Sequence, residues 1–359
     1  MALVTKITLY LTLILFFFGQ LFRLNFLNFS FPLFSLTLLP LAFFNLFTQK
    51  NIRSKLKHPA TYFIIFSLFT LIYNWFKFSF SFSSLFYWLR LISLLSFFIF
   101  PLKTDEKLNR FFQLILWSSL TFGFIQYFIW PDFTAFSAFN WDPHLYRLVG
   151  NFFDPTFIGL IFLLFILKIY FKYSSNKLLI FLPYLGLALT YSRSSLLAFF
   201  IVFSYISLKT KKLLLFLSTF LLISLTIFLL PRMPGEGTKL ERTSSIKAKI
   251  ENYKEGLKLF STSPLIGIGY NNLPVIKASS VSHAKSGFDS SLLTITITTG
   301  IIGLFLFSNI FISSLNSSSL YWQSLLLAVF IHSLFANSLL YPWILFYLAF
   351  EFKYRKSAR

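Results

Sequence analysis

The chain has 359 residues, of which 56% are hydrophobic, only 12% are charged and 53 are Phe. A soluble domain carries roughly 25% charged residues, so this composition excludes a soluble two-domain protein and predicts that much of the surface faces lipid. The net charge of +21 is typical here of basic cytoplasmic loops and anionic partners, and no nucleic-acid partner is expected. Cysteine is absent, which excludes disulfides and thiolate metal sites.

Apolar runs recur from the N-terminus to the C-terminus. A bilayer core of roughly 30 Å takes about 20 apolar helical residues to cross. Because the runs continue to the end of the chain, the first is expected to be a retained span and not a cleaved export signal. The predicted fold class is therefore all-α, a polytopic membrane protein with about twelve transmembrane helices. These cover residues 5–22, 25–47, 60–78, 82–102, 111–130, 155–171, 178–191, 194–208, 213–230, 291–312, 319–336 and 338–351.

Five basic clusters give the orientation. They all fall on one side of the membrane if the twelve spans alternate in direction, and the positive-inside rule makes that side cytoplasmic. Both termini are then predicted to be cytoplasmic. The clusters lie at residues 50–57, 103–110, 172–177, 209–212 and 353–359.

The predicted organisation has three parts: residues 1–230 with nine helices, a long external loop at 231–290, and residues 291–359 with three helices and a cytoplasmic tail. Basic residues outnumber acidic ones in the loop, which fits either an external anion site or an ordinary translocated loop. An apolar stripe steps by four and three residues and predicts an amphipathic helix. Such a helix lies on the membrane surface or packs on the mouth of the bundle. The stripe is Ile246, Ile250, Tyr253, Leu257 and Phe260.

Three arginines are candidates for binding an anion. Arg193 lies among three serines between two apolar runs, where a charge is costly and marks a functional-site candidate. A guanidinium binds phosphate oxygens through two parallel hydrogen bonds, although Arg193 can instead extend to lipid headgroups. Arg90 lies inside the fourth span and either lines the same cavity or pairs with a carbonyl. Arg242 precedes the amphipathic helix, whose N-terminus itself favours anions, or is a solvated surface residue.

Two side chains at the end of the long loop are candidates for a general base. His283 and Asp289 both accept protons, while Asp289 is equally well placed to cap the following helix. His332 lies in the eleventh span toward the outer side. No Asp-x-Asp pair, nucleotide-binding loop or zinc-binding spacing occurs, so neither a metal nor a cofactor is expected.

Five pieces of sequence occur in an order that is similar to the O-antigen ligase / O-antigen polymerase superfamily of bacterial membrane glycosyltransferases. Within the first piece, Asp154 is expected to cap a helix that begins at Pro155. Together the pieces cover about residues 145–305, and the first 140 residues match only as apolar spans. The pieces are Arg147–Pro155, Thr190–Ser194, Pro264–Tyr270, Asp289–Leu293 and Thr299–Gly303.

The resemblance implies a multi-pass enzyme of the bacterial cytoplasmic membrane with its active site at the external face. Such enzymes move a glycan from an undecaprenyl-diphosphate carrier to a hydroxyl of an acceptor glycan or lipid, without a metal. Arginines hold the diphosphate, which assigns Arg193 and Arg242 to that role; Arg90 and Arg147 complete the predicted set. Ligases usually carry His where this chain has Asp289, and polymerase-like members often carry Asp, so the sequence favours a polymerase and leaves Asp289 and His283 as rival bases.

Two other functions are compatible with the sequence. A transporter or flippase of lipid-linked glycans also has about twelve spans and a basic cavity, although no similar halves are seen. A non-catalytic assembly protein would tolerate substitution of Arg193, Asp289 and His283 together.

Overall fold

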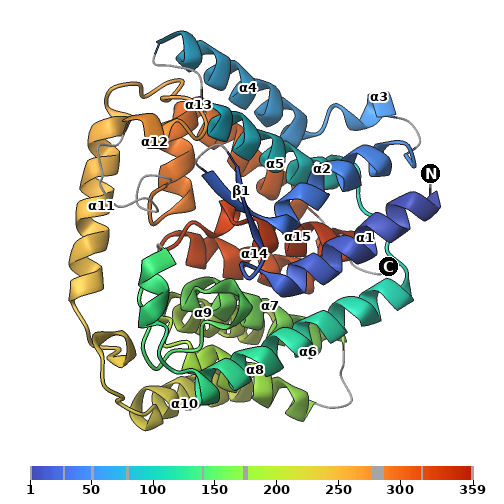
Figure 1. The fold of residues 1–359 in the computed structure, drawn as a ribbon. Helices are drawn as coiled ribbons and strands as arrows, with labels where there is room; N and C mark the ends of the chain where they lie inside the picture. Colours follow the sequence, from blue (N-terminus) through green and yellow to red (C-terminus); the bar gives the residue numbers. More distant parts are fainter. Residues whose placement is uncertain are drawn as a thin grey trace.

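The protein was analysed as a computed structural model, which describes residues 2–26, 29–49, 52–77, 81–139, 141–172, 177–276, 287–316 and 318–356. The described part of the chain is mostly helical, and a helix lies in each of the twelve predicted ranges (Figure 1). In chain order these helices are α1 (Ala2–Phe18), α2 (Leu33–Leu46), α4 (Pro59–Lys77), α5 (Phe82–Ile99), α6 (Glu106–Ile129), α7 (Pro155–Lys172), α8 (Phe181–Leu189), α9 (Arg193–Thr210), α10 (Leu213–Leu229), α13 (Ser291–Leu315), α14 (Leu320–Ser333) and α15 (Pro342–Glu351). The additional helices are α3 (Ile52–Lys55), α11 (Ser244–Phe260) and α12 (Leu273–Ile276).

Helix length bears on the predicted number of spans. Among the described residues, five helices (α4, α5, α6, α7 and α13) are long and apolar enough to cross a membrane, and others are apolar but shorter. The chain is thus a helical protein with several candidate membrane spans, and the number twelve stays a prediction. Large apolar side chains point outward, for example Phe76 at 90% and Phe228 at 85% exposure. A contiguous apolar surface of this kind is stable when it contacts lipid.

The prediction of a helix from residue 25 is wrong. Residues on either side of a tight connection form a two-stranded antiparallel hairpin, β1 (Arg23–Phe26) and β2 (Phe29–Pro32), with Arg23 opposite Pro32. Polar and apolar residues alternate there, with Leu24 between Arg23 and Asn25, and period-two alternation favours a strand. Helix α2 begins only after Pro32, whose backbone is extended. The described fold is therefore helical with one short β-hairpin added to it.

The predicted basic clusters gather at one end of the bundle. The ammonium Nζ of Lys6 lies 2.7 Å from Asp105 Oδ2, and Lys353 Nζ donates to the Thr104 carbonyl at 3.0 Å. Lys172 Nζ lies 3.3 Å from the centre of the Tyr354 ring. These contacts bring the N-terminus, two basic loops and the C-terminal segment together, and Figure 1 shows both termini on this side. We call the opposite end the outer end, in keeping with the predicted orientation.

Helix α11 crosses the outer end, roughly perpendicular to the long helices of the bundle (Figure 1). It confirms the amphipathic helix predicted from the apolar stripe. Tyr253 and Phe260 pack in a cluster with Leu293 and Ile297 of α13. Leu257, from the same stripe, remains 58% exposed. The stripe thus attaches α11 to the mouth of the bundle and leaves an apolar edge uncovered.

A buried ion pair joins helices near the end of the bundle that holds the termini. Lys168 Nζ of α7 lies 2.6 Å from Glu351 Oε1 of α15, and both side chains are fully buried. Asn109 Oδ1 accepts a second bond from Lys168 at 2.8 Å, and the Tyr321 hydroxyl donates to Glu351 Oε2 at 2.9 Å. Removing either ion leaves its partner charged in a low-dielectric interior, which is far more costly than losing both.

We predict that Lys168→Met or Glu351→Gln alone lowers the free energy of unfolding by about 3–5 kcal/mol. The double variant Lys168→Met/Glu351→Gln should recover much of the loss, because Gln keeps an acceptor for Tyr321. Thermal unfolding in nanodiscs measures the effect. The exposed pair of Lys6 and Asp105 is the control, since Lys6→Met should change stability by roughly 1 kcal/mol or less. Single variants of the buried pair with wild-type stability would contradict the assignment.

Candidate functional site

The turn between α8 and α9 sets the position of Arg193. Ser192 caps α9, since its hydroxyl accepts from the Ser195 amide at 3.4 Å, and Arg193 is the first helical residue. Tyr191 has a left-handed backbone (φ 51°) that reverses the chain there, and its hydroxyl donates to the Pro231 carbonyl at 2.8 Å. Arg193 therefore projects from a helix N-terminus at the outer end, where the positive end of the helix dipole adds to its charge.

The loop before α7 places Arg147 against this turn. Gln126 Oε1 accepts from the amides of Val149 and Gly150 at 2.9 and 3.1 Å, which fixes the loop on the end of α6. Arg147 Nε then donates to the Thr190 carbonyl at 2.9 Å, and the side chain is buried. A residue some forty positions away in sequence thus lies directly behind Arg193.

Arg242 comes from the long loop and completes what we call the arginine cluster, Arg147, Arg193 and Arg242. Arg193 Nη1 donates to the Arg242 carbonyl at 2.8 Å. Arg242 Nη1 in turn donates to the carbonyls of Gly237 and Lys239, at 2.7 and 3.0 Å. Backbone oxygens therefore hold these side chains, which leaves their positive charge largely uncancelled.

The electrostatics of the cluster agree with this geometry. Burial, followed by the charges of Arg242 and Arg193, lowers the pKa of Arg147 to about 9, and Asp154 opposes that change. Burial and the charge of Arg193 also lower the pKa of Arg242. Burial and the nearby Arg147 and Arg242 lower the pKa of His144 to about 3, so this imidazole is neutral at pH 7. Such mutual repulsion is relieved when an anion binds.

Asp154 is the carboxylate beside the cluster. As predicted, it caps α7: Oδ1 accepts from the amides of Thr156 and Phe157, at 2.7 and 3.4 Å, and Pro155 is the first helical residue. Burial raises the pKa of Asp154, against the effects of those bonds and of Arg147. Glu236 is a second carboxylate near the cluster, since its charge opposes the lowering of the pKa of Arg242. Two carboxylates, one of them committed to a cap, do not balance three guanidinium groups.

Strained backbone occurs next to the site residues. Among the described residues, five non-glycine positions have positive φ, and three of them are Tyr146, Phe153 and Tyr191. These directly precede Arg147, Asp154 and the Ser192 cap. A left-handed non-glycine residue costs on the order of 1–3 kcal/mol, and such residues concentrate at functional sites. These three residues therefore lower the stability of the fold, and the packing around them holds the turns in place.

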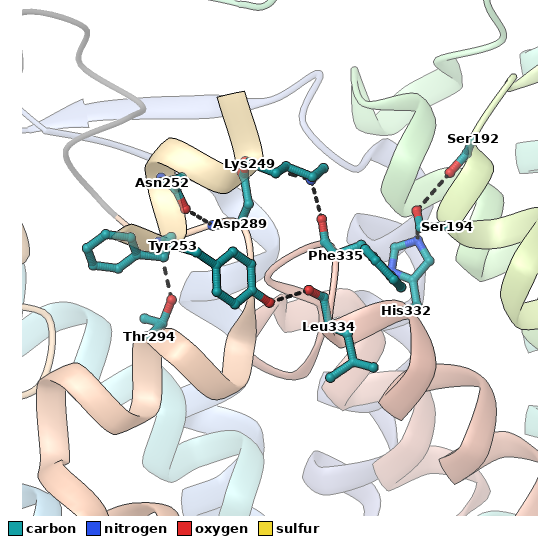
Figure 2. Close-up of polar contacts among 11 residues, drawn as sticks. Ser192, Ser194, Lys249, Asn252, Tyr253, Asp289, Thr294, His332, Leu334 and Phe335 are labelled. Carbon is teal, nitrogen blue, oxygen red and sulfur yellow. Dashed lines mark hydrogen bonds and ion pairs between the residues drawn. The ribbon is translucent and has the colours of Figure 1, made fainter. Parts of the chain in front are cut away.

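A buried hydrogen-bond network supports the N-terminus of α9 from behind. His332 Nε2 lies 3.2 Å from both the Ser194 and the Ser195 hydroxyl, and Nδ1 lies 2.6 Å from the Ser338 hydroxyl. Ser192 bonds to Ser194 at 3.2 Å, and Figure 2 shows this chain of contacts. His332 is fully buried, and it contacts the first turn of α9 through the Ser194 and Ser195 hydroxyls.

The candidate base Asp289 lies on the other side of this network. Its Oδ2 is 3.7 Å from Lys249 Nζ of α11, and its amide donates to Asn252 Oδ1 at 2.8 Å. Lys249 also donates to the Phe335 carbonyl, so it connects α11 to the segment after His332 (Figure 2). The alternative in which Asp289 caps the next helix is wrong, because Ser290 is the N-cap of α13. His283, the rival base, lies outside the described residues.

The four predicted arginines do not form one group. Arg147, Arg193 and Arg242 contact the same turns, whereas Arg90 lies with its Cζ 4.5 Å from the centre of the Tyr87 ring on α5. Lys249 of the amphipathic helix was not among the residues predicted for the site. Its position on the helix face toward the bundle, one turn before Tyr253, was the available signal.

The molecule so far described is a multi-helix protein with several candidate membrane spans and a dense arginine cluster at one end. Residues 178–308 match the O-antigen ligase family, which confirms membership of the O-antigen ligase / O-antigen polymerase superfamily for this part of the chain. The matched segment contains Arg193, Arg242, Lys249 and Asp289. A comparison with curated proteins finds no match. The family match indicates a membrane enzyme of glycosyl transfer, related to polysaccharide biosynthesis.

We predict that His332→Leu lowers the free energy of unfolding by about 1–3 kcal/mol for each hydroxyl left without a partner. Thermal unfolding of purified protein measures this change. Phe330→Leu, an exposed position on the same helix, is the control and should be nearly neutral. Equal stability of the two variants would mean that the serine–histidine network does not support α9.

Proposed function

We propose that the protein transfers a glycan from undecaprenyl diphosphate to an acceptor hydroxyl at the outer face of the cytoplasmic membrane. The single observation that carries the proposal is the arginine cluster. Its guanidinium groups stay charged at physiological pH, come from three separate segments, and are held by backbone carbonyls. A diphosphate offers the paired oxygens that guanidinium groups bind best.

The donor's leaving group is the part of the substrate that the cluster stabilises. When the bond between the anomeric carbon and the diphosphate oxygen breaks, the electron pair stays on the diphosphate. Fixed positive charge close to that oxygen favours the transition state over the ground state. The N-terminus of α9 contributes in the same direction, because its dipole points its positive end toward Arg193.

The acceptor hydroxyl is activated by Asp289, which lies on the other side of the serine–histidine network from the arginine cluster. The Asp289 carboxylate takes the proton from the acceptor hydroxyl while its oxygen forms the new bond to the anomeric carbon. Lys249 Nζ, 3.7 Å from Asp289 Oδ2, forms an ion pair that connects this carboxylate to α11. A single displacement of this kind inverts the anomeric centre, and no covalent enzyme intermediate forms. Asp289 in place of the usual ligase His favours transfer onto a growing glycan, as in a polymerase.

We predict that Arg193→Ala slows glycan transfer at least about 30-fold, since losing a hydrogen-bonded partner of a buried charge costs roughly 2–5 kcal/mol and each 1.36 kcal/mol is tenfold in rate. Arg193→Lys should be intermediate, because it keeps the charge but not the planar fork. Chain growth in proteoliposomes with a lipid-linked donor measures the rate. Arg110→Ala is the control, at the opposite end of the molecule and largely exposed. Wild-type transfer by Arg193→Ala would refute the assignment.

We predict that Asp289→Asn lowers the transfer rate by about 10²–10⁴-fold and leaves donor binding unchanged, because Asp289 does not belong to the arginine cluster. His283→Gln is the parallel variant. If it abolishes transfer while Asp289→Asn does not, His283 is the base and the role given to Asp289 is wrong.

The same reconstituted protein distinguishes an enzyme from a transporter or flippase. A transferase lengthens the glycan and releases the polyprenyl diphosphate carrier. A flippase moves the lipid-linked glycan across the bilayer without a change in any covalent bond. Movement of an intact donor with no released carrier would replace our proposal with the transport function.

A further inference from the structure

A second basic group lies at the outer end, apart from the arginine cluster. Its centre is Arg23, which the hairpin itself holds in place: Nε donates to the Ser30 hydroxyl at 2.8 Å and Nη2 donates to the Ser30 carbonyl at 2.7 Å. Nη1 donates to Gln20 Oε1 at 2.5 Å. The guanidinium carbon also lies 5.2 Å from the centre of the Trp141 ring. The hairpin thus presents one oriented cation beside an aromatic ring.

Arg90 supplies the second cation. It comes from α5, and its guanidinium lies over the Tyr87 ring. Burial is the main cause that lowers the pKa of Arg23, and the charge of Arg90 acts in the same direction. The hairpin packs on α5 through the rings of Phe31 and Phe86, whose centres are 4.5 Å apart, and this contact brings the two guanidinium groups to the same part of the outer end. We call Arg23 and Arg90, with the rings of Trp141 and Tyr87, the hairpin site.

No carboxylate neutralises the hairpin site. All eleven Asp and Glu residues of the chain belong to the part that the structure describes, and none of the ion pairs found there includes Arg23 or Arg90. Arg23 and Arg90 are each partly exposed, but two adjacent cations without a counter-charge repel each other, and a bound anion relieves that repulsion. This excess charge points to a ligand, because the fully buried cation Lys168 is instead paired with a carboxylate, that of Glu351.

The hairpin site and the arginine cluster take different anions. Tyr341 connects the two groups: its hydroxyl accepts from Gln20, the residue that Arg23 contacts, and its ring stacks on Phe157, whose amide donates to Asp154. Asp154 in turn interacts with Arg147 of the cluster. A carboxylate placed between two basic groups repels a single anion that bridges them. Two separate anionic groups, one on each side of Asp154 and Tyr341, fit the arrangement.

We propose that the hairpin site binds an acidic sugar of the acceptor glycan, so that the acceptor is an anionic saccharide. The inference rests on the proposed function, which supplies a diphosphate donor for the arginine cluster and leaves the hairpin site for the second substrate. Arg23 and Arg90 bind the carboxylate or phosphate of the sugar through charge-assisted hydrogen bonds. The rings of Trp141 and Tyr87 offer flat surfaces against which the C–H face of a sugar ring packs. Arg90 is thereby assigned to the acceptor and not to the diphosphate.

Equilibrium binding to the full chain in nanodiscs tests this assignment. The probes are trigalacturonic acid, a neutral galactose trisaccharide of equal length, glucose 6-phosphate and inorganic phosphate. Wild-type protein should bind trigalacturonic acid or glucose 6-phosphate at least tenfold more tightly than the neutral trisaccharide, and raised salt should weaken that preference. The two acidic probes distinguish a carboxylate from a phosphate on the sugar. A preference for inorganic phosphate over both acidic sugars would overturn the proposal.

Variants connect the preference to the hairpin site. Arg90→Gln should weaken binding of the acidic sugar at least tenfold and leave the neutral trisaccharide unchanged. Arg23→Gln should do the same, but Arg90→Gln is the safer variant because Arg23 also holds the hairpin. Trp141→Phe should reduce the fluorescence change that accompanies binding. Arg110→Gln is the matched control and should bind like wild type. Equal binding of acidic and neutral probes by wild type, or a charge preference that survives in Arg90→Gln, would overturn the proposal.

The design separates this inference from the proposed function. Arg193→Ala should lose binding of farnesyl diphosphate and keep binding of the acidic sugar, and Arg90→Gln should show the reverse. If Arg90→Gln loses farnesyl diphosphate instead, the hairpin site belongs to the donor: the inference is wrong while the proposed function survives. If wild type binds the acidic sugar through Arg90 but never transfers a glycan, the proposed function fails alone.

Discussion

The constraint on which this structure depends is that a guanidinium cannot give up its proton to escape burial. Lysine or histidine in such a place would become neutral, but Arg147, Arg193 and Arg242 remain charged and must be solvated by the protein. Backbone carbonyls of Thr190, Arg242 and Gly237 provide that solvation. These carbonyls belong to turns and loops, where they are not already bonded within a helix. The outer end therefore consists of tight turns with left-handed residues, placed on a bundle of regular helices.

Charge is neutralised within the fold at one end of the molecule and is in excess at the other end. Toward the end that holds the termini, Lys168 and Glu351 are fully buried and satisfy each other, and Asn109 and Tyr321 complete their hydrogen bonds. That arrangement holds helices together, and neither charge is available to bind a ligand. At the outer end, the three guanidinium groups of the arginine cluster meet without a matching number of carboxylates beside them, since Asp154 caps α7 and Asp289 pairs with Lys249. Unbalanced charge of one sign at a membrane surface is the physical property expected of a protein that holds a phosphorylated lipid.

Patterns that depend only on neighbouring residues could be read from the sequence. The apolar runs located the long helices, the four-and-three stripe located α11, and Asp154 with Pro155 marked the start of α7. The hairpin at Arg23 was missed because a run of Phe and Leu dominates its composition and hides a period-two alternation. The partners of each site residue could not be predicted, since they come from distant segments: Arg147 finds Thr190, and His332 finds Ser194. For the same reason the surroundings of Arg90 could not be predicted: its guanidinium lies over the Tyr87 ring of α5, and its place among the four arginines stays a prediction.

The most direct measurement is a comparison of farnesyl diphosphate, farnesyl monophosphate and farnesol binding to the protein in nanodiscs by native mass spectrometry. The account predicts that wild type prefers the diphosphate to the monophosphate at least tenfold, because a diphosphate engages more than one guanidinium at once. It also predicts that this preference disappears in Arg193→Ala/Arg242→Ala. Equal affinity of wild type for all three compounds, or an unchanged preference in the double variant, would show that the arginine cluster does not hold the leaving group.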